Sequence, residues 1–343
     1  MWQVENDTPF AAAGNWVRDR DGAEIWIVAV RCTLEIHADG TTAVASVQDP
    51  PVLAPVFFGD PAKSSLRYDS DFHLTKPTTD ILLHGHAYAP HGRPASETSV
   101  TMRVGDVSKT LRVLGSREYE QGLQANSAQP FVRVPIRYEM TYGGGETDLM
   151  VASPRPKFDP RNPVGTGFIA TAGTPAPNIV YPSGSADRPA GFGPIAPHWH
   201  PRVTYAGTYD DAWQKHRLPL YPTDLDDRFF LCSPEDQRPR EHLRGGELVE
   251  LINLAADGPM SFVLPCMAFR FETQFRGKPA VTHRSALCTV ILEPDEHRLV
   301  MVWQSWLPAH ADVHRLEQTV VKSLQVLNVP ARSVPHGVVF DDD

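Results

Sequence analysis

The chain contains little cysteine, and no two cysteines are spaced as a pair. Its 343 residues include only Cys32, Cys232, Cys266 and Cys288, without any C-x-x-C spacing. That spacing is typical of zinc sites and thioredoxin-type motifs, so neither is indicated. Few, scattered cysteines fit a reducing compartment, and we therefore expect four free thiols.

Motifs for nucleophilic catalysis and phosphate binding are also missing. The sequence has no G-x-S-x-G and no S-x-x-K. Gly143-Gly144-Gly145 follows a predicted strand, but no G-x-G-x-x-G or GK[ST] spacing follows it. A turn explains these glycines better than a phosphate site does, and we expect no cofactor.

Clusters of positive charge and long apolar runs are absent too. The chain has 32 Lys and Arg against 41 Asp and Glu, a net charge of −9, which disfavours non-specific binding of nucleic acid. No stretch approaches the roughly 18 apolar residues that span a bilayer. The first ten residues include acids and no apolar run, unlike a signal peptide. We expect a soluble, cytoplasmic protein without nucleic-acid or membrane partners.

What the chain does contain is many short β-patterns, bounded by Gly, Pro and Asp turn signals. The segment 24–36 is apolar on both sides at first and alternates at its end, and Asp39-Gly40 marks a hairpin turn after it. We predict strands at 24–36, 42–47, 79–88, 98–104, 108–114, 131–140, 248–254, 260–264, 267–275, 280–292 and 297–306.

Helical signals are few. A short helix is predicted over 209–216, with Thr208 as its N-cap and two acids in its first turn. A C-terminal helix is predicted because five apolar residues fall at helical spacing: Val313, Leu316, Val320, Leu324 and Leu327.

The stretch 188–230 combines six prolines and three glycines with many aromatic rings. That is too much proline for regular structure and too many rings for a flexible linker. We expect an ordered irregular segment whose rings pack against strands from both ends of the chain. Phe229 or Phe230 should be a core residue, and Trp199 or Trp213 should be exposed.

These patterns predict a mainly β fold within one domain spanning 1–343. Two β-sandwich-like halves, 1–141 and 247–330, would be bridged by a long, ordered segment rich in Pro, Gly and aromatic residues, 142–246. Whether the halves are separate sandwiches or one continuous β-structure stays open.

There are two H-x-H pairs: His84-Gly85-His86 lies on a predicted strand, where this spacing points both rings to one side, and His198-Trp199-His200 lies in the stretch 188–230. A metal site needs a third ligand, and none has matching spacing, so we predict no metal. Asp226 and Asp227 are adjacent and should point apart, which does not suit a pair of catalytic carboxylates. Arg228 is expected to bridge to one of them.

Several motifs in this order resemble the bacterial family catalogued as domain of unknown function 2169. They include W-x-V-x-N-x-T-P-F (2–10), GDP-x-KSSLRY (59–68), GHAYAP (85–90), YGG (142–144), NP-x-G-x-G (162–167), RPAGFGPI (188–195), Trp199, YD-x-AW (209–213) and DDRFF (226–230). The resemblance covers residues 1 to about 306.

The resemblance implies an accessory protein of the type VI secretion system. Such a protein is an adaptor or chaperone that escorts a secreted effector, often one with a PAAR domain, to the VgrG spike. The family implies no enzymatic activity and no catalytic residues. The alternative is a β-rich carbohydrate-binding protein or hydrolase, with the same aromatics stacking on sugar and Asp226 or Asp227 as the acid.

For the adaptor hypothesis, the aromatic stretch is the expected partner surface, because aromatic residues are favoured at interaction hot spots. The predicted partner-binding residues are Trp199, Tyr205, Tyr209, Trp213, Asp226, Arg228 and Phe229.

Overall fold

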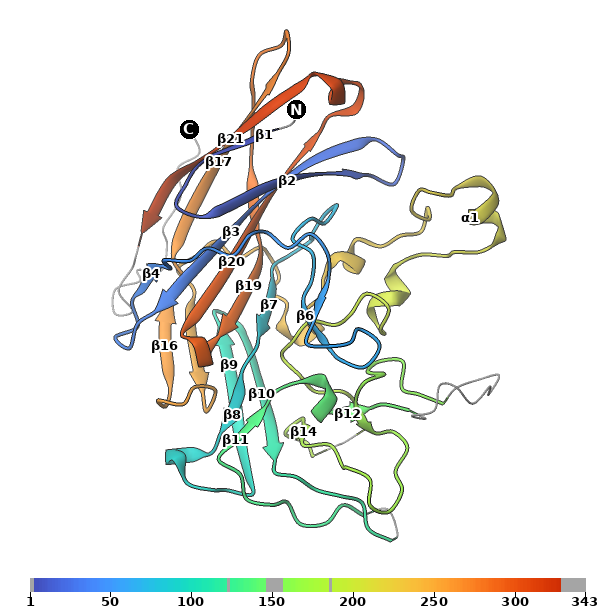
Figure 1. The fold of residues 1–343 in the computed structure, drawn as a ribbon, viewed down its shortest axis with the longest axis vertical. Helices are drawn as coiled ribbons and strands as arrows, with labels where there is room; N and C mark the ends of the chain where they lie inside the picture. Colours follow the sequence, from blue (N-terminus) through green and yellow to red (C-terminus); the bar gives the residue numbers. More distant parts are fainter. Residues whose placement is uncertain (1–2, 122–123, 146–156, 185–186, 328–343) are drawn as a thin grey trace.

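The computed structural model describes residues 3–121, 124–145, 157–184 and 187–327 (Figure 1). Strands dominate the described chain, and its one α-helix, α1 (Asp211–His216), is short. The prediction of a mainly β fold is confirmed. The 3-10 turns are η1 (Pro90–Gly92), η2 (Tyr138–Met140), η3 (Arg202–Tyr205), η4 (Asp227–Phe230), η5 (Glu235–Gln237), η6 (Pro294–Glu296) and η7 (His310–Arg315).

A six-stranded sheet forms the centre of the molecule. Its order is β2-β3-β20-β19-β7, and β4 pairs with β3 as the predicted hairpin. Strand β3 is buried on both faces from Ile25 to Leu34, as its continuous apolar run predicted, and Glu35 is then exposed. The strands are β2 (Ala11–Arg18), β3 (Glu24–Ile36), β4 (Thr42–Val44), β7 (Asp80–Leu83), β19 (Ser285–Glu293) and β20 (Arg298–Pro308).

A five-stranded sheet has the order β14-β10-β9-β15-β16. The predicted hairpin at its centre is confirmed: β9 and β10 pair antiparallel through a turn in which Gly105 has a φ of +54°, a conformation that favours glycine. The strands are β9 (Glu97–Val104), β10 (Val107–Leu114), β14 (Ile179–Val180), β15 (Leu248–Ile252) and β16 (Met260–Val263).

A four-stranded sheet corrects the prediction for the C-terminal region. Residues Leu316–Leu327 form strand β21, not a helix. The strand lies between β1, to which it is parallel, and β17, to which it is antiparallel. The apolar residues at helical spacing do not share one face, because Leu316 is buried while Leu324 is 62% exposed. The other strands are β1 (Gln3–Asp7), β17 (Cys266–Phe275) and β18 (Val281–His283).

Three predicted strands are interrupted. Segment 79–88 divides into β7 and β8 at His84-Gly85, segment 280–292 divides into β18 and β19, and segment 131–140 becomes β11 followed by η2. Three two-stranded pairs complete the fold: β5 (Val56–Phe57) with β6 (Leu66–Tyr68), β8 (His86–Tyr88) with β11 (Arg133–Pro135), and β12 (Tyr142–Gly143) with β13 (Thr166–Gly167).

The strands of segments 1–141 and 247–330 share their sheets. Each of the three larger sheets contains strands from both segments, so the β-structure is continuous rather than two separate sandwiches. One buried cluster joins side chains of all three sheets and includes Phe192 from the stretch 188–230. This stretch therefore packs against strands from both ends of the chain, as predicted. No helix in the described ranges is long and apolar enough to cross a membrane.

Candidate functional site: an anchored arm and the cleft beside it

The bridging segment is fixed to β7, the edge strand of the central sheet. Leu83 donates its backbone N–H to the Phe192 carbonyl at 3.2 Å. The buried Gln237 side chain donates to the carbonyls of Ile81 (2.8 Å) and Phe192 (2.9 Å). Because buried backbone groups need partners, this bonding sets the path of an otherwise irregular segment.

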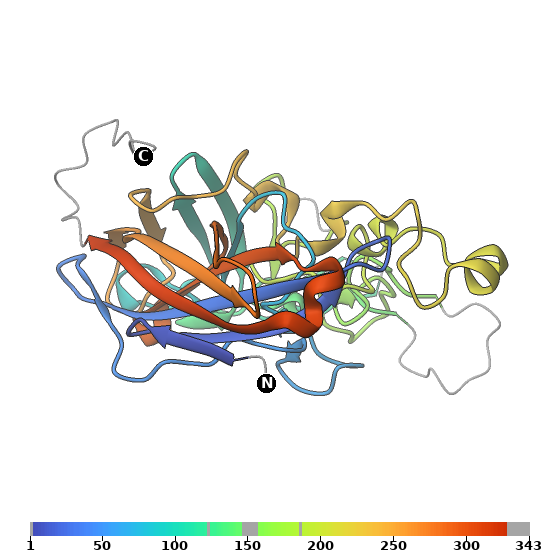
Figure 2. The same ribbon diagram turned by 90° about the horizontal axis from the view of Figure 1, so that it is seen from above.

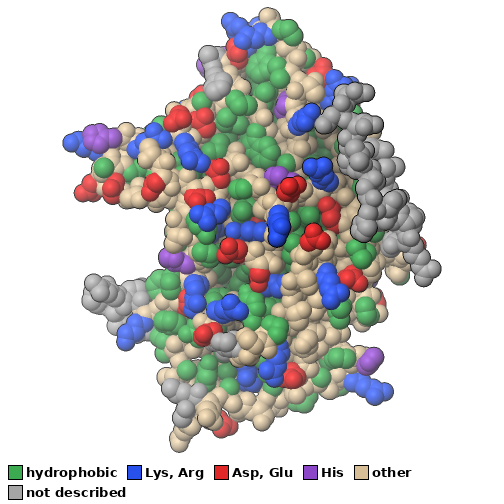
Figure 3. Space-filling view, turned by 180° about the vertical axis from the view of Figure 1, so that it is seen from behind, with side chains coloured by type: hydrophobic (Ala, Val, Ile, Leu, Met, Phe, Trp, Pro, Cys, Tyr) green, Lys and Arg blue, Asp and Glu red, His purple; other side chains and the backbone are tan. Residues whose placement is uncertain are grey.

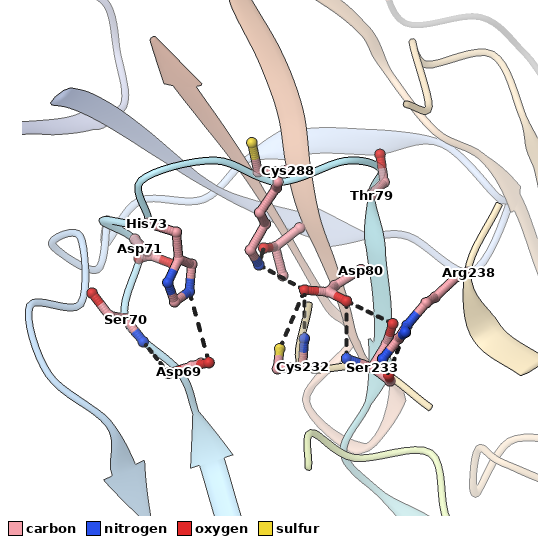
Figure 4. Close-up of polar contacts among 12 residues, drawn as sticks. Asp69, Ser70, Asp71, His73, Thr79, Asp80, Cys232, Ser233, Arg238 and Cys288 are labelled. Carbon is pink, nitrogen blue, oxygen red and sulfur yellow. Dashed lines mark hydrogen bonds and ion pairs between the residues drawn. The ribbon is translucent and has the colours of Figure 1, made fainter. Parts of the chain in front are cut away.

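Asp80 is the centre of this attachment (Figure 4). Its carboxylate accepts from the backbone N–H of Cys232 (3.0 Å) and of Ser233 (2.9 Å), and from the Ser233 hydroxyl at 2.6 Å. The Lys76 ammonium donates to the same carboxylate at 2.7 Å. Burial would raise the pKa of Asp80, but Lys76 and these hydrogen bonds hold it well below its usual value. A charged carboxylate in the core thus holds the far end of the bridging segment.

A second buried ion pair holds the middle of the segment. The Arg202 guanidinium lies 2.6 Å from Asp69 and also donates to the carbonyls of Ile195 (2.9 Å) and Phe229 (2.7 Å). Burial alone would raise the pKa of Asp69, but Arg202 and then His73 hold it below its ordinary value. Arg202 therefore clamps two parts of the stretch 188–230 onto the body.

Between these anchors the chain leaves the body as an arm, which we define as residues 207–222. Figures 1 and 2 both show α1, at the tip of the arm, standing away from the sheets. On the arm, the rings of Tyr209 and Trp213 lie 4.7 Å apart, and Tyr209 is 52% exposed. Trp213 is half-buried and donates its indole N–H to the Leu220 carbonyl at 2.8 Å.

The helix within the arm begins two residues later than predicted. Asp210, not Thr208, is the N-cap of α1, and its side chain accepts from the Trp213 backbone N–H. Thr208 instead donates its hydroxyl and its backbone N–H to Asp224, at 2.7 and 3.0 Å. These bonds close the base of the arm.

The base of the arm is also tied to the turn between β2 and β3. Arg20 forms an ion pair with Asp227, and Arg217 donates to the Arg20 carbonyl. Beside them, Arg228 binds Asp226 through two nitrogens, at 3.0 and 2.6 Å. The prediction that Arg228 bridges to one of the two aspartates is confirmed.

The structure brings together most of the predicted partner-binding residues. The Arg228 guanidinium lies over the Tyr205 ring at 4.3 Å, and η3 packs on η4, which contains the half-buried Phe229. These residues form the base of the arm, below Tyr209 and Trp213. Figure 3, from behind, shows charged side chains of both signs on the arm where it projects at the left.

Trp199 does not belong to this surface. It is 1% exposed and packs with Leu66, Tyr138 and Ala196 in a separate buried cluster. Of the two tryptophans, one of which was expected to be exposed, Trp199 is buried because its ring fills the space beneath the segment, and Trp213 is half-buried. Phe230 is 3% exposed, so the prediction of one core residue in the Phe pair is confirmed.

A cleft of about 860 Å³ lies beside the segment, and the sequence analysis did not predict it. At its wall, the buried Lys109 ammonium donates to the Gly191 carbonyl (2.6 Å), Asp236 (2.8 Å) and Gln237 (2.7 Å). Burial lowers the pKa of Lys109 to about 8, although Asp236 opposes the shift. Arg188 stacks over the Tyr181 ring at 4.0 Å at the mouth of the cleft.

One signal for this cleft was present in the sequence. In β10, Lys109 stands in phase with the inward-facing residues Val107, Leu111 and Val113. A lysine at a buried strand position needs several oxygen partners, and these come here from the bridging segment. The position of Lys109 in the pattern therefore marks where the segment docks.

The two histidine pairs do not form metal sites with their neighbours. Within the residues that the structure describes, no group of three His, Cys, Asp or Glu is placed to hold a metal ion. His86 instead contacts Asp295 at 2.6 Å, and His198 accepts from the Trp199 indole at 3.0 Å. That the purified protein carries no metal stays a prediction.

The comparison with known families agrees with the motifs along the chain. The model of the family described as "Uncharacterized protein conserved in bacteria (DUF2169)" matches residues 21–304. No curated protein and no solved structure matches the chain. Because the match spans well over half of the sequence, the chain belongs to the DUF2169 family.

Proposed function

We propose that this protein is an accessory protein of the bacterial type VI secretion system, acting in the cytoplasm as an adaptor or chaperone. It binds a secreted effector, often one with a PAAR domain, and helps to load it on the VgrG spike. The proposal rests on what membership of this family implies and on one feature of the structure, the anchored aromatic arm.

The arm supports a role in protein binding because it presents aromatic rings on a fixed support. Tyr209 is 52% exposed and its ring packs against the half-buried Trp213, and aromatic residues are enriched at interaction hot spots. Hydrogen bonds from Thr208 to Asp224 and the Arg20–Asp227 ion pair hold the base of the arm. A rigid arm loses little conformational entropy on binding, which favours affinity.

The same proposal assigns no enzymatic activity to the protein. The alternative hydrolase needs a carboxylate that is free to act as an acid at the aromatic surface. Asp226 is instead bound by Arg228, and Asp227 by Arg20. The hydrogen bonds from Arg228 lower the pKa of Asp226, and the Asp227 carboxylate is engaged by Arg20, so this arrangement favours the adaptor over the hydrolase.

The test is affinity purification of the tagged protein from its native bacterium after mild cross-linking. We expect an effector with a toxin domain to be recovered with PAAR and VgrG proteins. If the recovered proteins contain no secretion component, and the protein instead hydrolyses or tightly binds a polysaccharide, the alternative holds.

A further inference from the structure

A second, smaller pocket of about 320 Å³ contains the first histidine pair, which the proposed function does not use. It lies where β6, the β7–β8 junction, the segment after β11 and the β19–β20 turn meet. Its walls include Phe58, Arg67, His84, Arg137, Glu293 and Asp295. Its volume falls within the range of small-ligand sites.

The buried Glu293 and the half-buried Asp295 of this pocket already have partners from the protein. Glu293 accepts from the Tyr68 hydroxyl and from the Arg298 guanidinium. Asp295 contacts His86 Nδ1 and accepts from the Tyr88 hydroxyl, both at 2.6 Å. Burial would raise the pKa of both carboxyls, but these partners hold each pKa below its usual value. Neither acid therefore needs a ligand.

Of the two arginines that line the pocket, Arg137 lacks a carboxylate partner within the described ranges and Arg67 has only a long one. The Arg137 guanidinium lies over the Phe58 ring at 4.1 Å, and no carboxylate in the described parts of the chain lies within 4.0 Å of it. Arg67 also lies over Phe58, at 5.8 Å. The carboxylate nearest to Arg67 is Glu293 at 4.0 Å, which Arg298 already binds. The Phe58 ring thus lies against two guanidiniums, of which Arg67 has one long contact to Glu293 and Arg137 has no carboxylate contact among the described residues.

His84 adds an unpartnered polar group to the same wall. Its side chain is 8% exposed, and its Nε2 atom has no hydrogen-bond partner among the described residues. The ring is held edge-on to Phe58 and Tyr68, each at 5.5 Å. Burial lowers the pKa of His84 to about 4, so the ring is neutral near pH 7. A buried polar atom without a partner indicates a missing ligand or water.

We propose that this pocket binds a carboxylate, held by the Arg67 and Arg137 guanidiniums at the wall that also carries His84. A planar guanidinium matches a carboxylate in a two-point contact. A phosphate dianion fits less well, because Glu293, Asp295 and Glu296 also line the pocket and repel added negative charge. The carboxylate can belong to a free small acid or to the C-terminus of a peptide.

The experiment is an NMR titration of the protein with acetate, a monocarboxylate, and with inorganic phosphate at constant ionic strength. The Arg137→Gln variant is the main test, since Arg137 is exposed and its removal leaves no buried acid unpaired. Arg103→Gln is the matched control, because Arg103 pairs with Glu250 on the surface of the β9–β15 pair.

We expect saturable acetate binding that weakens at least tenfold in Arg137→Gln and is unchanged in Arg103→Gln. The His84 ring resonances should shift on binding. A short peptide is then titrated with a free and with an amidated C-terminus, to identify the source of the carboxylate. Tighter binding of the free form indicates the C-terminus of a peptide, and equal binding of the two forms indicates a free small acid. Equal affinity for acetate in wild type and Arg137→Gln, no saturable acetate binding, or tighter binding of phosphate than of acetate would each overturn the proposal.

Discussion

The Lys76 ammonium lies 2.7 Å from an Asp80 carboxylate oxygen, and both side chains are almost fully buried. Asp80 belongs to β7 of the central sheet and also binds the backbone of Cys232 and Ser233. Burial would lower the pKa of Lys76, but Asp80 raises it above its usual value, so the pair is charged. An ion pair in the core thus holds the irregular segment to the sheet.

Replacing one member of this pair should be strongly destabilising. We predict that Lys76→Met lowers the free energy of unfolding by about 3–5 kcal/mol, because it leaves the Asp80 charge buried without its partner. Lys278→Met is the control, since Lys278 pairs with Asp312 at the surface, and it should leave the unfolding midpoint nearly unchanged. Urea unfolding measures both variants, and equal midpoints would contradict a structural role for the buried pair.

Stability should also fall as the pH drops from about 6.5 toward 4.5. Burial lowers the pKa of His73 to about 3, against the effect of Asp69, and lowers the pKa of His84 to about 4. As the pH falls, these histidines are protonated in the unfolded chain before they are protonated in the folded protein. Each histidine therefore lowers the free energy of unfolding by up to about 1.4 kcal/mol per pH unit in this window. Asp69 and Glu293, whose pKa values are depressed, lose their contribution only at lower pH.

The measurement is the free energy of unfolding at pH 7.0, 5.5 and 4.5 for wild type and for His84→Gln. The variant should show a shallower decline with falling pH. Parallel declines would show that His84 is not the buried neutral group described above.

One cysteine should react in the folded protein and three should not. The structure has all four as free thiols, with Cys32, Cys232 and Cys288 buried and Cys266 half-buried. Burial raises the pKa of Cys288 to about 12, which suppresses its thiolate. We predict that one thiol per protein reacts quickly with a thiol reagent at pH 8, and that this reaction is lost in Cys266→Ser. Under denaturing, non-reducing conditions four thiols per protein should react. Two or fewer reactive thiols in the denatured protein would indicate disulfides.

The two tryptophans of the stretch 188–230 should respond differently to truncation. Trp199→Ala should cost about 3–5 kcal/mol of stability, because it empties a packed site between Leu66 and Tyr138. Trp213→Ala should cost much less, since Trp213 is half-buried on the arm. Thermal unfolding of both variants compares them directly, and similar losses would mean that the arm is part of the core.

Much of the fold was predictable because β-patterns are local. Alternation and the turn at Gly105-Asp106 were enough for the β9–β10 hairpin. The C-terminal helix was mispredicted because apolar spacing of three and four residues arises in strands as well. Residues Leu316–Leu327 form a strand because they pair with β1 and β17. Pairing with strands so distant in the sequence leaves no local signal.

The site was predictable in part for a similar reason. Tyr209, Trp213 and the Asp226–Arg228 pair belong to one short stretch, so their proximity follows from the chain. Trp199 was misassigned because a tryptophan favours cores and interfaces equally. The cleft beside Lys109 joins β10 to residues more than 80 positions away, which composition and spacing do not predict.

Effector binding by the arm is the claim on which the proposed function most depends. The direct measurement is the amount of effector that copurifies with the double variant Tyr209→Ala, Trp213→Ala, at matched melting temperature. Phe168→Ala is the control, an aromatic residue that is 38% exposed but lies outside the arm. The account predicts at least a tenfold loss of effector for the double variant and none for the control. Normal effector recovery by a stable double variant would contradict it.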